Sequence, residues 1–180
     1  MSKGITHKVD RQMNISRGWL LLPVMIAILL MLPRLLNAEF GFLDDAGVLA
    51  RSSKLIRGEW NQLLEPGNGR FRPFYWLYPT LIYILAHQKP EWYFLGNMLL
   101  LVVTTSSIMI LTNRVTGSRY IALWSGLFFV LSGPVIESYY TLSKGEPLQI
   151  AWILISLLAL CEYRRLKSQK SRGTFLGLLV

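Results

Sequence analysis

Cysteine, histidine and charged side chains are all scarce in this chain of 180 residues. The single cysteine, Cys161, excludes an intramolecular disulfide, and its place near the end of an apolar segment predicts an inert packing role. The two histidines, His7 and His87, are isolated, so the sequence predicts no zinc site. Charged residues make up 16% of the chain and apolar residues 52%, whereas soluble domains have about 25% charged residues. This composition excludes an ordinary soluble domain and indicates a membrane protein.

The net charge of +9 does not indicate nucleic-acid binding. Lys and Arg lie at the ends of the apolar segments rather than along one polar face. Membrane proteins gather such residues in their cytoplasmic loops, where they set the topology. We therefore expect membrane lipids, and no nucleic acid, as partners.

Four apolar segments approach the length that crosses a bilayer, at 19–36, 92–112, 120–136 and 148–163. A helix rises about 1.5 Å per residue and must cross roughly 30 Å of hydrocarbon, for which the last two segments are short. Residues 173–180 have the composition of the start of a fifth span, so the chain is expected to be part of a longer protein. The predicted fold is an all-α polytopic membrane protein with four spans plus the start of a fifth.

The first span follows a basic N-terminus, residues 1–18, and a cleaved signal peptide is the alternative interpretation. Pro33-Arg34 interrupts the apolar run, and Leu36 is a poor residue for the third place before a cut after Ala38. We therefore expect an uncleaved anchor.

Residues 73–86 (PFYWLYPTLIYILA) form a further apolar segment, which is shorter than the ~17 residues of a span and contains Pro79. If this segment does not span, the N-terminus, the loop 113–119 and the basic loop 164–172 all face the cytoplasm, as the positive-inside rule requires. If it spans, the basic loop 164–172 falls on the opposite side of the membrane from the basic N-terminus, which violates that rule. We therefore predict that residues 73–86 lie along the outer surface.

This topology gives a cytoplasmic N-terminus and two outer connections, at 37–91 and 137–147. Most of the acidic residues lie in them: Glu39, Asp44, Asp45, Glu59, Glu65, Glu91, Glu137 and Glu146. The ordinary solubility of a loop explains this concentration, and a functional site is the other explanation. The absence of sorting signals and the short loops favour a bacterial inner membrane.

The large outer loop is expected to carry two interfacial helices. Asp44 or Asp45 is placed to cap a first helix over residues 46–57. The apolar side of that helix contains Val48, Leu49, Leu55 and Ile56. Its basic side contains Arg51, Lys54 and Arg57. Such a helix tends to lie in the headgroup plane. The second interfacial helix is the segment 73–86.

Two candidate sites follow from the charges. Asp44 and Asp45 share the large outer loop with Arg70 and Arg72, whose planar side chains pair well with phosphate. The plainer interpretation is that the acids cap a helix and that the arginines meet lipid headgroups. In the second outer connection, Glu137 and Glu146 flank Lys144, and ionisable groups near membrane depth suggest a function because they are costly there. That inference weakens if the two acids lie among headgroups.

The order of these features resembles the N-terminal part of the C-type glycosyltransferases, which use polyprenyl-phosphate-linked sugars. Within that family, the chain is similar to the protein O-mannosyltransferases and the lipid A aminoarabinose transferases. The resemblance covers residues 19–165 and is carried by FGFLDDAGVLA, RFRPFYWLYPTLIYIL and GPVIESYYTLSKGEPLQ. The chain departs from the family in having Asp45 where Glu is usual and Arg72-Pro73 in place of a double Pro. It also has far fewer spans.

The resemblance implies an inverting sugar transfer from a polyprenyl-phosphate donor to an unknown lipid, glycan or protein acceptor outside the cytoplasm. It assigns Asp44 as the catalytic base and Asp45 as its partner. Glu146, and by a weaker match Glu137, would touch the sugar or the acceptor. The candidate substrate-binding cations are Arg70, Arg72 and Lys144.

No cofactor is expected, and a divalent metal at the Asp44–Asp45 pair is the alternative that is not favoured. These 180 residues are not expected to be active alone. A non-enzymatic multi-span scaffold, or an inactive shortened relative, explains the spans equally well. A transporter is a third alternative, for which residues 104–107 supply the few polar groups within a span.

Overall fold

The computed structural model describes residues 17–41, 44–63 and 72–177, with side chains outside this description for Arg17, Asp44 and residues 168–177. Every regular element in this part of the chain is a helix, so the predicted all-α class is confirmed. In chain order the elements are η1 (Arg17–Leu21), α1 (Leu22–Leu36), α2 (Asp44–Ile56), η2 (Trp60–Leu63), α3 (Pro73–Ala86), α4 (Pro90–Thr116), α5 (Arg119–Val130), α6 (Gly133–Tyr140) and α7 (Glu146–Gly177).

Three helices of the described chain are long and apolar enough to cross a membrane: Gly18–Leu36, Pro90–Thr116 and Glu146–Lys167. The pair α5 and α6 passes the same test together, but it is bent by 57°. The chain therefore has three candidate spans, or four if the bent pair crosses as one. Their placement in lipid and the outer loop remain predictions.

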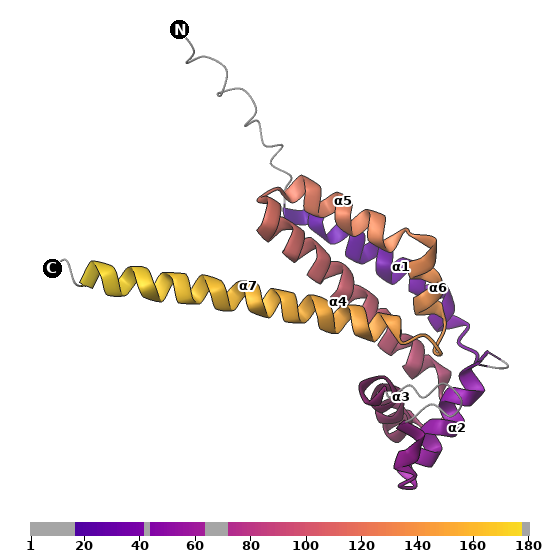
Figure 1. The fold of residues 1–180 in the computed structure, drawn as a ribbon. Coiled ribbons are helices and arrows are strands. Elements are labelled where there is room, and N and C mark those ends of the chain that lie inside the picture. The colour runs from indigo at the N-terminus through magenta and orange to yellow at the C-terminus, as the bar shows by residue number, and fades with distance from the viewer. Residues whose placement is uncertain (1–16, 42–43, 64–71, 178–180) are drawn as a thin grey trace.

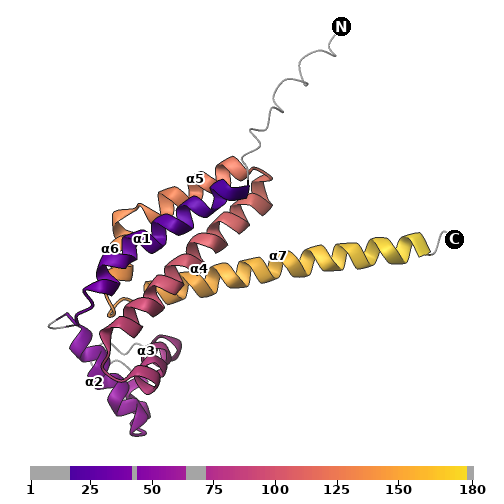
Figure 2. The same cartoon turned by 180° about the vertical axis from the view of Figure 1, so that it is seen from behind.

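Helices α1, α4 and α5 pack side by side as a bundle (Figures 1 and 2). Its core contains Ala27, Met31, Leu101, Val130 and Tyr139. Small residues allow close approach of membrane helices, and Gly126 of α5 is such a residue. A Cβ atom there would lie 2.7 Å from Cγ of Met109 and 3.1 Å from Cβ of Pro23.

The buried hydroxyl groups of α4 serve helix packing within this bundle. Thr105 donates to the carbonyl of Leu101 at 2.8 Å, and Thr104 accepts from the hydroxyl of Tyr139 at 3.0 Å. Both threonines are fully buried. The bond of Thr104 joins two helices, whereas that of Thr105 stays within α4; buried hydroxyl groups of this kind fit helix packing, the plainer interpretation of residues 104–107.

The third predicted span, 120–136, is not one straight helix. Helix α5 ends at Val130, and α6 begins at Gly133, with Pro134 in its first turn. Proline has no N–H to give to the preceding turn and clashes with it, which favours a kink or break at this point.

Helix α7 runs without a break through residues 164–172, where the sequence analysis placed a loop. The segment contains neither Gly nor Pro, and most of its residues are Arg or Lys, which favour helices. The described residues of the expected fifth span, up to Gly177, belong to this same helix, and 178–180 lie outside the described chain.

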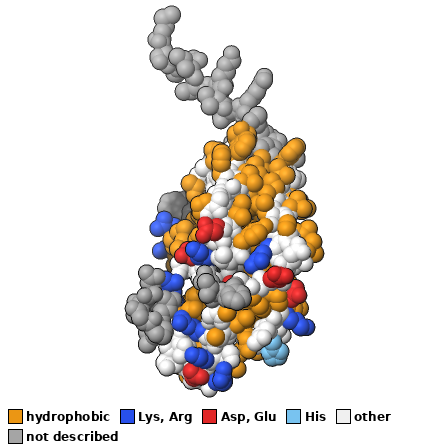
Figure 3. Space-filling model, turned by 90° about the vertical axis from the view of Figure 1, so that its right-hand side faces the viewer, with side chains coloured by type: hydrophobic (Ala, Val, Ile, Leu, Met, Phe, Trp, Pro, Cys, Tyr) orange, Lys and Arg blue, Asp and Glu red, His pale blue; other side chains and the backbone are white. Residues whose placement is uncertain are grey.

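Helices α2 and α3 lie together at one end of the bundle (Figure 1). The connection between α6 and α7 lies at this same end, and the turn between α4 and α5 lies at the other. Figure 3 shows charged side chains gathered over the lower part of one face and apolar side chains above them. The two predicted outer connections therefore share one end of the fold.

Candidate functional site

The connection between α6 and α7, residues 141–145, is hydrogen-bonded to three other helices. Leu142 donates its N–H to Oδ1 of Asp45 at 3.3 Å, and its carbonyl accepts from the hydroxyl of Tyr75 at 3.1 Å. The side-chain amide of Asn97 donates to the carbonyls of Tyr139 at 3.0 Å and Thr141 at 3.3 Å. Side chains from α2, α3 and α4 thus hold the backbone of residues 139–142, which we call the clamped segment.

Asp45 connects the two predicted outer connections to each other. Its side chain is 3% exposed, and Oδ2 accepts from the N–H of Gly41 at 2.7 Å. A Cβ atom on Gly41 would lie 3.2 Å from Oδ2, so glycine suits this close approach. Hydrogen bonds to a carboxylate are stronger than those between neutral groups. The bonds that the structure describes for Asp45 run to segments outside α2, rather than capping that helix.

The other predicted acid and arginines fall mostly outside the described structure. Asp44 is the first residue of α2, but its side chain is not described, and Arg70 lies in the undescribed segment 64–71. Arg72 directly precedes α3 and is half-buried; its carbonyl accepts from the N–H of Trp76 at 3.2 Å. Phosphate binding by these arginines remains a prediction.

Glu137, Lys144 and Glu146 lie near the clamped segment but are exposed. Nζ of Lys144 lies 3.7 Å from Oε1 of Glu137, and an exposed pair of this kind contributes about 0–1 kcal/mol. Glu146 is in the first turn of α7, where a negative charge interacts favourably with the helix dipole. Because neither acid is buried within the chain, the argument from costly burial weakens for both.

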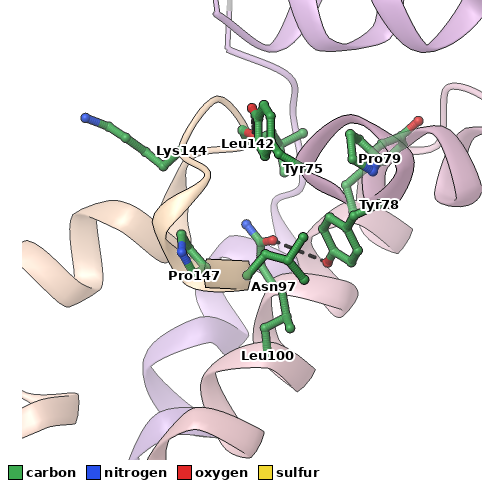
Figure 4. A pocket seen from close by; sticks show the side chains of 10 residues that line it. Tyr75, Tyr78, Pro79, Asn97, Leu100, Leu142, Lys144 and Pro147 are labelled. Carbon is green, nitrogen blue, oxygen red and sulfur yellow. Dashed lines mark hydrogen bonds between the residues drawn. The ribbon is translucent and has the colours of Figure 1, made fainter. Parts of the chain in front are cut away.

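A small pocket lies between α3, α4 and the 141–145 connection (Figure 4). Its volume is about 330 Å³ when its open mouth is included, and its interior has room for about one water molecule. The residues lining it are Tyr75, Tyr78, Pro79, Tyr93, Asn97, Leu100, Leu142, Lys144, Pro147 and Leu148. This pocket is too narrow to hold a sugar as it stands.

The polar groups of this pocket are engaged in contacts within the protein. The Tyr78 hydroxyl donates to Oδ1 of Asn97 at 3.5 Å (Figure 4). Burial raises the pKa of Tyr78, and Tyr139 acts in the same direction, so the hydroxyl stays protonated and remains a donor. Lys144 extends away from Asn97. The sequence analysis missed Tyr75, Tyr78 and Asn97, although a lone amide such as Asn97 in an apolar span is itself a signal.

Arg34, in the last turn of α1, is another residue that the sequence analysis did not select. Its guanidinium carbon lies 4.1 Å from the centre of the Phe94 ring, a cation–π geometry. Its Nε is buried and has no hydrogen-bond partner among the described residues. Arg34 therefore adds a cation near the end of the first candidate span.

The described residues contain no group of three or more His, Cys, Asp or Glu side chains placed to hold a metal ion. The Asp44 side chain is not among those residues. A metal at the acid pair is therefore neither supported nor tested.

Asn97→Ala is expected to loosen the clamped segment. The change removes two hydrogen bonds to backbone carbonyls, and buried groups left without partners are costly. The reporter is Leu142→Cys in a Cys161→Ser background, because Leu142 is 8% exposed and its backbone bonds do not depend on its side chain. Maleimide should label this cysteine several-fold faster when Asn97→Ala is added.

The matched control is Thr116→Ala, which removes a 2.8 Å hydrogen bond to Thr112 at the opposite end of α4. It should leave the labelling rate unchanged. An equal labelling rate with and without Asn97→Ala would show that Asn97 does not hold the segment.

Comparison with protein-family profiles, curated proteins and solved structures finds no match to this chain. The resemblance to C-type glycosyltransferases therefore rests on the residues of the sequence alone.

Proposed function

We propose that this chain is the N-terminal portion of a membrane glycosyltransferase. The enzyme would transfer a sugar from a polyprenyl-phosphate donor to an acceptor on the non-cytoplasmic side of a bacterial inner membrane, with inversion. The observation that supports this most is the buried Asp45 carboxylate, which bonds to both Gly41 and Leu142. In this proposal these bonds hold the start of α2 at the end of the apolar bundle, where a lipid-linked donor and a water-soluble acceptor would both reach the acid pair.

In this proposal Asp44 takes the proton of the acceptor hydroxyl. The acceptor oxygen attacks the anomeric carbon, and the bond from that carbon to the phosphate oxygen breaks on the opposite face. Polyprenyl phosphate leaves with the bonding electrons, and cations stabilise its charge. Arg70, Arg72 and Lys144 are the candidate cations.

The remaining acids have supporting roles in the same proposal. Asp45 positions the start of α2 and does not touch the reacting atoms, because its described bonds go to backbone N–H groups. Glu146 and Glu137 would contact the sugar or the acceptor from the second outer connection.

A non-enzymatic membrane scaffold is the second candidate. It is favoured by the same bonds of Asp45, since a carboxylate that binds two backbone N–H groups also suits a purely structural role. Such a protein would bind lipid and partner helices without consuming a sugar donor.

Donor consumption separates the two candidates without knowledge of the acceptor. Native membranes that contain the complete protein, or lack it, are supplied with radiolabelled polyprenyl-phosphate mannose, glucose and aminoarabinose. We expect release of polyprenyl phosphate from at least one donor only when the protein is present, and equally with the exposed-loop variant Glu59→Gln. Failure to consume every donor, with normal protein levels, would favour the scaffold.

The proposal also requires the end that carries α2 and α3 to face away from the cytosol. In a Cys161→Ser background, Glu59→Cys and Lys89→Cys should react with a membrane-impermeant maleimide in cells whose inner membrane is intact. Thr116→Cys should react only after that membrane is opened, because it lies at the opposite end of α4. The reverse pattern would place the acid pair in the cytosol and end the glycosyltransferase proposal.

A further inference from the structure

Helix α3 has one face buried in the protein and one apolar face that no described residue covers. The buried face contains Tyr75, Trp76, Pro79, Thr80 and Ala86. The opposite face contains Phe74, Leu77, Leu81, Ile84 and Leu85, which are between 44% and 76% exposed. These five follow the spacing of one side of a helix and form a continuous apolar stripe.

Helix α2 uses its own apolar side to cover the buried face of α3. Val48 and Leu55 pack against Tyr75 and Trp76. On the same side, Asp45 and Ser52 are buried as well. Helix α2 therefore has little apolar surface left for lipid. This differs from the sequence-based expectation that the apolar side of α2 contacts the membrane directly.

The exposed stripe of α3 is continuous with the exposed surface of a candidate span. Phe74 lines a groove with Trp152 and Ile153 of α7, with a volume of about 830 Å³ including its open side. Trp152 and Ile153 are 54% and 60% exposed. The apolar surface of α7 and that of α3 thus meet at this groove.

The charges around α3 fit a helix that lies within one leaflet. Its sequence, PFYWLYPTLIYILA, has no charged residue, and it contains aromatic residues of the kind that gather at membrane interfaces. At its C-terminal end, the exposed residues His87 and Lys89 are polar or charged and can extend towards headgroups. A second apolar protein surface would not require this arrangement of charge at the end of the helix.

We propose that α3 is inserted in the outer leaflet through this stripe, with phospholipid acyl chains as its partner. Helix α2 lies on the far side of α3, in the headgroup and water region, and has no contact with acyl chains. The pair is thus a two-layer unit in which α3 anchors the acid pair of α2 to the membrane surface. The contact with acyl chains follows from exposure and packing, and the choice of the outer leaflet follows from the predicted topology; neither depends on the glycosyltransferase proposal.

Site-directed spin labelling of the complete protein in phospholipid vesicles tests this placement. Single cysteines replace Leu81 and Leu85 on the stripe and Ala50 and Lys54 on the exposed side of α2, all in the Cys161→Ser background. Labels at Leu81 and Leu85 should be relaxed mainly by oxygen, which concentrates in lipid. Labels at Ala50 and Lys54 should be relaxed mainly by water-soluble nickel chelate. We expect the ratio of the two effects to differ several-fold between the helices.

Two other results would overturn the proposal. Strong relaxation by the nickel chelate at Leu81 and Leu85 would show that the stripe faces water. Weak relaxation by both reagents there would show that protein covers it, either a second copy or another segment. The two stripe positions lie one turn apart, so a local disturbance by one substitution does not decide the outcome.

Discussion

Asp44→Asn is expected to lower the rate of sugar transfer by about 10²–10⁴-fold, the usual contribution of a general base. The amide keeps the size of the carboxylate but cannot take the acceptor proton. Donor binding should change little, because the base is assigned to the acceptor side of the reaction. The measurement is the rate of polyprenyl phosphate release in membranes that contain equal amounts of variant and wild-type protein.

The control for this variant is Glu39→Gln, which neutralises another acid of the same loop. Glu39 is exposed and has no role in the proposed reaction, so transfer should stay near the wild-type rate. Wild-type transfer by Asp44→Asn, at normal expression, would remove Asp44 from the chemistry. Equal losses from both substitutions would point to the charge of the loop rather than to one base.

Sequence patterns predicted the limits of the short helices α2 and α3 more accurately than those of the long helices. The expected segment 73–86 coincides with α3, since Pro73 suits the first turn of a helix and the apolar run ends before polar His87. Helix α2 begins at Asp44 rather than at residue 46, a small difference at a boundary. These limits depend on local signals, which the sequence contains directly.

The interruptions of the long helices were harder to predict. The apolar composition of residues 120–136 continues across the break at Leu131–Ser132, so hydropathy alone concealed it. Pro134 was the available signal for that break. Residues 164–172 look like a loop by charge, but charge does not end a helix whose residues favour helical backbone.

The surroundings of Asp45 were not predicted. The sequence placed Asp45 at the site as the partner of Asp44, but not its bonds to Gly41 and Leu142. The bond to Leu142, and the bond of Tyr75 to the carbonyl of Leu142, join residues far apart in the chain. They go to backbone groups, which carry no sequence signal of their own. No pattern showed that α2 would pack on α3 either, because the apolar side of a helix does not identify the surface that covers it.

Asp45→Leu is expected to destabilise the protein by about 1–3 kcal/mol, the cost of leaving a buried donor without its partner. The N–H of Leu142 is the group that loses most, because its hydrogen bond to Asp45 is buried. Gly41 is exposed, so water can replace its bond. Asp45→Asn should have a smaller effect, since its amide keeps one acceptor oxygen. The measurement is the thermal unfolding midpoint in detergent, read alongside donor consumption.

Asp44→Asn is the comparison that separates positioning from chemistry. If Asp45 positions α2 and Asp44 acts as the base, Asp45→Leu lowers both the unfolding midpoint and transfer, whereas Asp44→Asn lowers transfer at an unchanged midpoint. Labelling of Leu142→Cys should also rise several-fold with Asp45→Leu and stay constant with Asp44→Asn. An unchanged midpoint and unchanged labelling in Asp45→Leu would mean that its bonds to Gly41 and Leu142 do not hold the two outer connections together. The acid pair would then have no fixed place at the end of the bundle, and the proposed site would lose its main support.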